Sequence, residues 1–248
     1  MSIPRFYVSK EKIQGKMGSI DGSELEHMRK VLRLRPGQGV ILFDSEGWEH
    51  EAVIQSYTAG VAEVEILRSN QPRRESPLDI ILVQAIGKGE KMDWVVEKAT
   101  ELGVRCIVPF FSTYTIPRLD AKKIEQRHAR WEKIALNAAK QSGRTRIPEI
   151  HKLSEFGSLV RRPWSCDLKL LFWERASDGG FHRVREERRH LDSILLVIGP
   201  EGGFTSEEVA HALDQDFQAV QLGKRLLRTE TAALGALSII QFLWGDMG

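Results

Sequence analysis

Two glycine-containing stretches carry the residue types best suited to holding a ligand. IGPEGGFT (198–205) and LGKRLLRTETA (222–232) each follow an apolar run. Glycine lets backbone amides approach a ligand closely, and ligands of open parallel sheets bind where strands end and helices begin. Neither stretch fits the dinucleotide pattern GxGxxG or the phosphate-loop pattern GxxxxGKS/T. The sequence therefore predicts a ligand site but favours neither a dinucleotide nor a nucleoside triphosphate.

The first stretch also has a structural interpretation, because a tight turn between a strand and a helix needs the same glycines. Thr205 and Glu208 have the spacing of a capping box and are predicted to begin that helix. The second stretch favours a ligand or a second chain, because small residues near its end permit close backbone approach. These small residues are Ala232, Ala233, Gly235 and Ala236.

Other chemistries find little support in the sequence. The seven histidines are scattered without a cysteine–histidine cluster, so no metal is expected. The GxSxG motif is absent, and a covalent mechanism is not indicated. Cys106 and Cys166 lie in apolar stretches without a CxxC motif, which predicts buried, reduced thiols and a cytoplasmic protein. The most apolar segment, AALGALSIIQFLW, is too short to cross a bilayer, and no secretion signal is seen.

The chain of 248 residues is expected to form two domains. Residues 1–70 alternate β-forming residues with glycine-containing turns, which predicts a small β-sandwich or barrel. One short helix is expected to interrupt the strands, with Ser23 as its N-cap and Glu26 completing a capping box. The polar, proline-containing stretch 68–77 places the domain boundary near residue 75.

After this boundary the apolar runs become continuous, as in strands that are covered on both faces. They alternate with helical patterns, which predicts an α/β domain with a mostly parallel sheet. Helices are expected at 92–102, at about 120–140 and from Thr229 to Trp244. The last helix is apolar nearly all round, so it is buried either within the domain or partly against a second chain.

Three stretches together resemble the cofactor-binding stretches of a known family. LLFWE (170–174), IGPEGGFT and LGKRLLRTETA are similar to those of the RsmE family, which are methyltransferases of the SPOUT superfamily. HMRKVLRLRPG (27–37), KMDWVVEKATELGV (91–104) and KQSGRTRIPEI (140–150) look like other signatures of the same family. The resemblance spans both expected domains in order.

The resemblance implies a small PUA-like β-barrel that binds RNA at 1–74 and a SPOUT α/β domain with a deep trefoil knot at 75–248. It also implies S-adenosylmethionine as methyl donor, a homodimer, and methylation of N3 of a uridine in 16S ribosomal RNA of the small subunit. Two alternatives remain open. One is a SPOUT methyltransferase that acts on another RNA or base, and the other is a non-catalytic RNA-binding or ribosome assembly factor.

The resemblance places the cofactor in the three matching stretches. Apolar side chains there are expected to bracket the adenine and the thioether, while loop amides and carbonyls bind the polar edges. Glu201 is predicted to bind ribose hydroxyls or attract the sulfonium, and its alternative role is a charge at a helix end. The predicted cofactor residues are Leu171, Phe172, Glu174, Ile198, Gly199, Pro200, Glu201, Gly202, Leu222, Gly223, Leu226, Leu227, Arg228, Thr229, Thr231 and Ala232.

The implied reaction needs a way to remove the uracil N3 proton. Either a base takes it, or cationic and hydrogen-bonding groups stabilise the uracil anion. Arg228, beside the second glycine stretch, is the first candidate for this electrostatic role, and Gln141 with Arg144 is the second. For each arginine the alternative is a solvated charge or a phosphate contact. No histidine is expected to act as the general base.

Basic residues concentrate in two places although the formal net charge is only +2. Such surfaces suit an RNA backbone, although a charge run is more often a solvated face. The first place is the expected helix of the first domain, with Arg29, Lys30, Arg33 and Arg35, together with Arg5. The second place is a basic run from Arg118 to Arg146. The charged segment 181–190 matches no motif. The predicted RNA-binding residues are Arg5, His27, Arg29, Lys30, Arg33 and Arg144.

Overall fold

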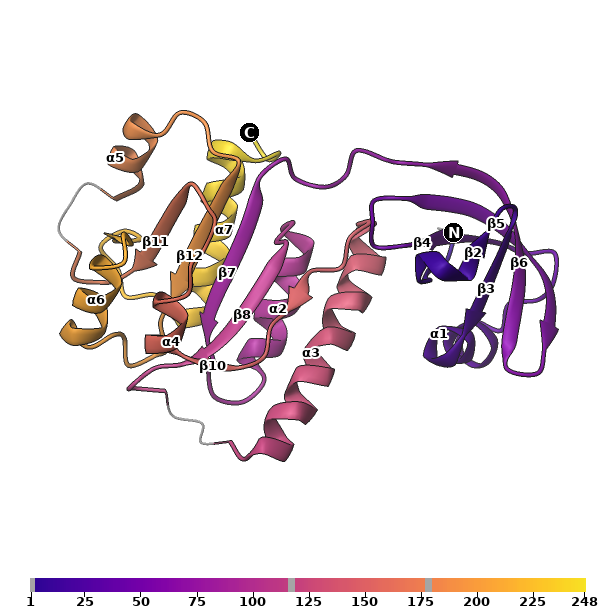
Figure 1. The fold of residues 1–248 in the computed structure, drawn as a ribbon, viewed down its shortest axis with the longest axis horizontal. Helices are drawn as coiled ribbons and strands as arrows, with labels where there is room; N and C mark the ends of the chain where they lie inside the picture. Colours follow the sequence, from indigo (N-terminus) through magenta and orange to yellow (C-terminus); the bar gives the residue numbers. More distant parts are fainter. Residues whose placement is uncertain (1–2, 116–118, 177–179) are drawn as a thin grey trace. The chain divides into compact units, whose positions relative to one another are not determined.

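The computed structural model describes residues 3–115, 119–176 and 180–248, which form two compact units (Figure 1). One unit comprises the chain up to Glu75 together with Ala139–Ile147, and the other comprises Ser76–Ala138 and Pro148–Gly248. Arg118, the start of the second basic run, lies outside the described residues. Within the described ranges, no helix has the length and apolar character needed to cross a membrane.

The first unit is built on a six-stranded sheet in the order β1-β4-β5-β6-β3-β2. β1 and β4 pair in parallel, and the other neighbours are antiparallel. Alternate side chains of a strand point to the same face, so Phe6, Leu42, Ile54 and Val64 meet in a buried core. The elements are β1 (Arg5–Tyr7), the 3₁₀ turn η1 (Lys10–Lys12), β2 (Ile13–Gln14), β3 (Met17–Asp21), β4 (Gly39–Phe43), β5 (Glu49–Thr58) and β6 (Val61–Asn70).

The short helix between β3 and β4 starts earlier than the sequence predicts. α1 (Gly22–Glu26) has Asp21 as its N-cap residue, so the predicted N-cap role of Ser23 is wrong. Ser23 already lies within the first helical turn and is not free to cap it. A π-helical turn, η2 (His27–Val31), continues the helix, and Arg33 then adopts a left-handed conformation with φ of 52°.

Residues 139–147 pack with the first unit, although α3 (Ala121–Ser142) begins in the second. Lys140 Nζ lies 2.9 Å from each carboxylate oxygen of Glu24 and 5.2 Å from the centre of the Phe6 ring. Arg144 Nη2 donates to Glu75 Oε2 over 2.7 Å. These ion pairs and the cation–π contact join segments that are distant in sequence, and no sequence pattern indicated the association.

The second unit contains a seven-stranded sheet in which all pairs are parallel, and the predicted α/β class is confirmed. The strand order is β10-β8-β7-β12-β11-β13, with β9 paired to β8. The continuous apolar runs form five of the strands, whereas the two-residue strands β9 and β10 were not predicted. The strands are β7 (Asp79–Ala85), β8 (Cys106–Phe111), β9 (Glu149–Ile150), β10 (Ser154–Glu155), β11 (Leu168–Phe172), β12 (Ser193–Ile198) and β13 (Gln218–Val220).

Helices lie on both faces of this sheet (Figure 1). α4 and α6 pack on the face that carries Val83, Val108 and Val197, while α7 contacts β12 and α2. The three predicted helices are found within two residues of the expected ends, and most of the charged segment 181–190 forms α5. The remaining helices are α2 (Lys91–Glu101), α4 (Phe156–Val160), α5 (Gly180–Glu187), α6 (Ser206–Leu213) and α7 (Thr229–Trp244).

Candidate functional site

A pocket of about 250 Å³ lies where β11, β12 and β13 end in the second unit. The parallel register aligns Phe172 of β11 with Ile198 of β12 and with Val220 of β13. The loops that follow these strands therefore leave the sheet at one level, as in other ligand sites of parallel sheets. The pocket is lined by Phe172, Trp173, Glu174, Ile198, Gly199, Pro200, Glu201, Gly202, Gly203, Phe204, Gln221, Leu222, Gly223, Arg225, Leu226, Leu227, Thr229 and Ala232.

Most of the predicted cofactor residues line this one pocket, but three do not. Leu171 is buried in the core, because neighbouring side chains of a strand point to opposite faces and Phe172 takes the pocket face. Arg228 is the exposed N-cap residue of α7, and Thr231 is exposed in the first turn of that helix. Whether any of these residues binds a cofactor stays a prediction.

Sequence reasoning missed five lining residues. Four of them are direct neighbours of a predicted residue, and the fifth, Phe204, lies within the first glycine stretch. Arg225 is the most consequential of them, because it brings a positive charge to a pocket whose other ionisable lining residues are Glu174 and Glu201. The five residues are Trp173, Gly203, Phe204, Gln221 and Arg225.

The first glycine stretch is shaped by close packing. A Cβ atom on Gly199 would lie 2.7 Å from the Phe204 ring, and one on Gly202 would lie 2.8 Å from Cβ of Tyr114. A larger residue would therefore move the loop at either position. The predicted capping box is confirmed, because Thr205 Oγ1 accepts from the Glu208 backbone and the Glu208 side chain accepts from the Thr205 backbone. The stretch is thus a structural turn and a pocket wall at once.

A buried hydrogen-bond chain joins the two glycine stretches. Thr229 Oγ1 donates to the Gly199 carbonyl oxygen over 2.7 Å and accepts from Gln84 Nε2 over 2.9 Å. Gln84, near the end of β7, is only 1% exposed. Because unsatisfied buried polar groups are costly, this chain favours one relative placement of β7, the loop after β12 and the start of α7.

Glu201 lines the pocket, but its carboxylate is already paired. Lys91 Nζ donates to Glu201 Oε1 over 2.9 Å. Burial alone would raise the pKa of Glu201, yet the hydrogen bond from Lys91 and backbone N–H groups lower this pKa overall. The same bond raises the pKa of Lys91. Glu201 is therefore held as a paired anion at the pocket, and its role toward the ribose or the sulfonium stays a prediction.

The region around this pocket matches a known domain family. Residues 74–241 match the model of an RNA methyltransferase domain, and residues 20–67 match that of an RNA methyltransferase PUA domain. The chain belongs to this RNA methyltransferase family.

Relatives within the family support the assignment. The chain is similar to "Ribosomal RNA small subunit methyltransferase E" of Bacillus subtilis (strain 168), with 34% identity over 228 residues, 90% of this chain and 89% of that protein. The protein of the same name from Buchnera aphidicola subsp. Schizaphis graminum is 30% identical over 245 residues, 99% of this chain and 98% of the relative. A crystal structure of a protein of this name from Neisseria gonorrhoeae, bound to S-adenosyl methionine, has a TM-score of 0.89 and 35% identity and covers 100% of both chains. The resemblance to the RsmE family is confirmed.

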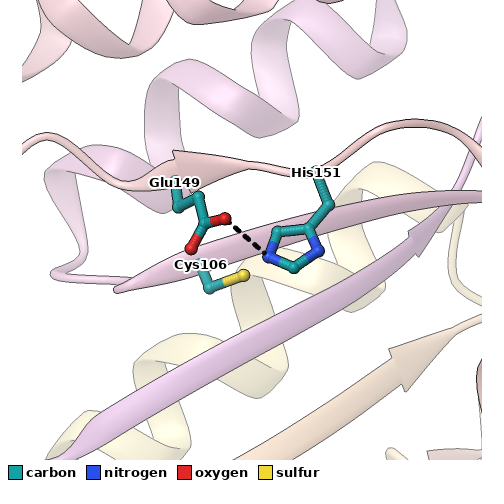
Figure 2. A group of neighbouring side chains, drawn as sticks. All are labelled: Cys106, Glu149 and His151. Carbon is teal, nitrogen blue, oxygen red and sulfur yellow. Dashed lines mark ion pairs between the residues drawn. The ribbon is translucent and has the colours of Figure 1, made fainter. Parts of the chain in front are cut away.

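One group of three metal-binding side chain types occurs elsewhere in the described part of this methyltransferase. Cys106, Glu149 and His151 converge where β8 and β9 pair (Figure 2). Arg162 Nη1 donates to His151 Nδ1 over 3.0 Å, and His151 Nε2 lies 3.1 Å from Glu149 Oε1. A guanidinium only donates, so Nδ1 accepts and Nε2 carries the proton toward Glu149.

The thiol of this group is also protonated. Burial, with a contribution from Glu149, raises the pKa of the Cys106 thiol to about 12. A cation would have to displace both the thiol proton and the Nε2 proton beside the Arg162 charge. Hydrogen bonding thus accounts for the arrangement of the imidazole and the carboxylate, and we assign no metal to the group.

The predicted RNA-binding residues of the first unit fall into two groups. Arg29, Lys30 and Arg33 are exposed, and the Arg29 guanidinium lies 5.1 Å from the centre of the Tyr57 ring. Arg5 and His27 are instead engaged inside the unit. Arg5 pairs with Glu49 and donates from Nη2 to the Arg144 carbonyl oxygen over 2.9 Å. Burial, together with the Lys140 charge, lowers the pKa of His27.

The second pair of catalytic candidates also belongs to the first unit. Arg144 is buried and donates from Nε and Nη2 to Glu75 Oε2, over 3.0 and 2.7 Å. Gln141 is exposed. Neither residue lines the pocket, whereas Arg228 follows directly on the lining residues Leu226 and Leu227. The roles of all three stay predictions, and the paired state of Arg144 favours a structural one.

Proposed function

We propose that this chain is an S-adenosylmethionine-dependent methyltransferase that acts on N3 of a uridine in the 16S ribosomal RNA of the small subunit. The observation that carries the proposal is the pocket in which the stretches 172–174, 198–204 and 221–229 meet. The relatives named above are small-subunit ribosomal RNA methyltransferases, and the Neisseria gonorrhoeae structure contains S-adenosyl methionine. Family membership and the pocket thus support the same activity.

The pocket residues fit this cofactor. Leu222, Leu226 and Leu227 offer apolar surface to the adenine and the thioether, and the glycine stretches offer backbone groups to its polar edges. When bound, S-adenosylmethionine supplies an electrophilic methyl group on a sulfonium. Glu174 and Glu201 are anionic side chains at the pocket that favour a cationic ligand.

Charge stabilisation is the catalytic role that we assign to arginine. Transfer of the N3 proton to solvent water leaves a uracil anion, which a nearby guanidinium stabilises. Arg228 is exposed next to the pocket residues Leu227 and Thr229. Arg225 lines the pocket itself and is a second candidate.

The exposed cations of the first unit are the proposed RNA contact. Arg29, Lys30 and Arg33 lie beside Val31 and Leu32, which are exposed apolar residues. Cations bind phosphates, and exposed apolar side chains suit unstacked bases. The PUA domain match at 20–67 covers all of these residues.

A second copy of the chain is the proposed partner of α7. Gly235, Ser238, Ile239 and Phe242 recur at helical spacing, and Phe242 is 62% exposed. A stripe with small residues and an exposed aromatic ring suits close helix packing. The trefoil knot, which the family resemblance implies, and the cytoplasmic location, which the cysteines predict, stay part of this proposal.

The decisive experiment uses small ribosomal subunits from a cell that lacks this gene. Incubation with labelled S-adenosylmethionine is expected to label 16S RNA, and mass spectrometry should find 3-methyluridine in it. Label in transfer RNA, or on another base, would favour the alternative substrate. A protein that does not retain the labelled cofactor would instead be an RNA-binding or assembly factor.

A further inference from the structure

Three charged side chains behind the pocket come from three separate segments. Lys91 is the first residue of α2, Glu201 belongs to the first glycine stretch, and Glu230 lies in the first turn of α7. Lys91 Nζ lies 2.9 Å from Glu201 Oε1 and 3.4 Å from Glu230 Oε2. One ammonium thus joins the loop after β12 to the starts of two helices, yet Lys91 is not among the pocket-lining residues.

The packing around this ammonium is tight. A Cβ atom on Gly87 would lie 3.2 Å from Glu201 Oε1 and 3.3 Å from Lys91 Cδ. The loop between β7 and α2 therefore approaches the ion pair closely because Gly87 has no side chain. The backbone N–H of Lys88, in the same loop, also helps to lower the pKa of Glu201.

Glu230 depends on Lys91 for compensation of its charge. Its Oε2 atom is buried and has no hydrogen-bond partner among the described residues, so the contact with the ammonium is electrostatic. Without the ammonium, two carboxylates that now face one nitrogen would repel each other, and one would be buried without a counter-charge. Loss of the ammonium is therefore unfavourable, and the repulsion between the two carboxylates would be reduced if the first glycine stretch and the start of α7 moved apart.

We propose that Lys91 is a positioning residue of the pocket, which binds Glu201 and Glu230 together and so holds the first glycine stretch against the start of α7. This inference rests on the proposed function for the identity of the ligand. The ammonium acts through Glu201, the pocket-lining member of the pair. The buried hydrogen bond between Thr229 and Gly199 joins the same two segments. The ion pairs of Lys91 are therefore a second contact between these segments, at a more exposed position.

The test compares K91M with a matched control on the same helix. Lys98 is also 31% exposed at its side chain and also bridges two carboxylates, with Nζ 2.8 Å from Glu97 and 2.8 Å from Glu101. In calorimetry with the full chain, K91M is expected to raise the Kd for S-adenosylmethionine about fivefold, a moderate effect for a partly exposed ion pair. K98M should leave the Kd unchanged, and K91R should restore most of the affinity.

A double variant separates positioning from direct contact. If Lys91 acts through Glu201, K91M will change the Kd little in an E201Q background, because the pair is already broken. Additive effects would mean that Lys91 touches the ligand itself and would overturn the proposal. In steady-state assays, K91M should raise KM for the cofactor while kcat and KM for RNA stay within about twofold.

The outcomes distinguish this inference from the proposed function. A wild-type chain that does not bind S-adenosylmethionine contradicts the proposed function. A wild-type chain that binds it, with K91M binding equally well, contradicts only the role of Lys91. Should K91M fail to fold, the K91M/E230Q variant removes the uncompensated buried charge, and its Kd is expected to show the same loss.

Discussion

The hydroxyl of Thr229 donates a 2.7 Å hydrogen bond to the carbonyl oxygen of Gly199. The bond joins two glycine stretches whose sequences look unrelated, through residues that are 30 positions apart in the chain. Gln84 donates to the same hydroxyl, so Thr229 is both donor and acceptor at this point. Three strands that end at one level and this bond together bring the loops to the same pocket.

We predict that Thr229→Val weakens cofactor binding as well as lowering stability. Valine keeps the shape but loses both hydrogen bonds, which leaves buried polar groups unsatisfied at a cost of about 1–3 kcal/mol. The Kd for S-adenosylmethionine should rise about tenfold or more in calorimetry. Thr58→Val is the control, because Thr58 is exposed at the end of β5 in the first unit, away from every predicted cofactor residue. Equal affinity of both variants would show that the bond does not shape the pocket.

Glycine substitutions in the two loops should abolish cofactor binding without unfolding the first unit. Gly199→Val places atoms in the Phe204 ring, and Gly223→Val puts a β-branched residue at a φ of +75°. Gly60→Val tests strain alone, because Gly60 has a φ of +83° with open space around it, in the turn between β5 and β6. Calorimetry should show lost binding for the first two variants and normal binding for the third. Normal affinity in all three would remove the loop assignment.

The sequence was sufficient to locate the pocket stretches because glycines at strand ends and continuous apolar runs are local signals. It was not sufficient to place Leu171 and Phe172, since a continuous apolar run does not show which side chain faces the core. Pairs between distant segments left no local signal either. The sequence predicts a catalytic or RNA-binding role for Arg144, but no local pattern indicates that Glu75 is its ion-pair partner. The role of Lys91 depends on two carboxylates that are more than 100 residues away in the chain, and no spacing rule reports such a contact.

We predict that the buried Cys106 thiol lowers the free energy of unfolding as the pH rises into the alkaline range. Burial raises its pKa from 9.0 to about 12, so the folded state keeps a proton that the unfolded state loses. The free energy of unfolding should therefore fall as pH rises between these values, by up to about 1.4 kcal/mol per pH unit. From pH 8 to pH 10, the wild type should lose about 1.4 kcal/mol more than Cys106→Ala in denaturant titrations. Parallel pH profiles of the two proteins would contradict the buried, protonated thiol.

Removal of two exposed cations from the first unit should weaken RNA binding through electrostatics alone. Arg29→Ala with Arg33→Ala is expected to lower affinity for small-subunit RNA and to reduce the slope of log K against log salt by about 1–2, because two phosphate contacts are lost. Cofactor affinity should not change. Lys10→Ala with Lys12→Ala removes the same charge from the same unit, at lysines already paired with Glu46 and Asp21. If both double variants bind RNA equally, the surface around Arg29 is merely solvated.

Self-association through α7 should be sensitive to a charge at its exposed aromatic residue. Phe242→Asp places a carboxylate in the stripe that we propose to pack against a second copy, where burying it would be unfavourable. Leu213→Asp is the control, because Leu213 is also an exposed apolar residue but ends α6. Sedimentation velocity should show a dimer for the wild type and for Leu213→Asp, and a monomer for Phe242→Asp. A wild-type monomer at micromolar concentration would exclude the dimer, and a dimer that survives Phe242→Asp would place the interface elsewhere.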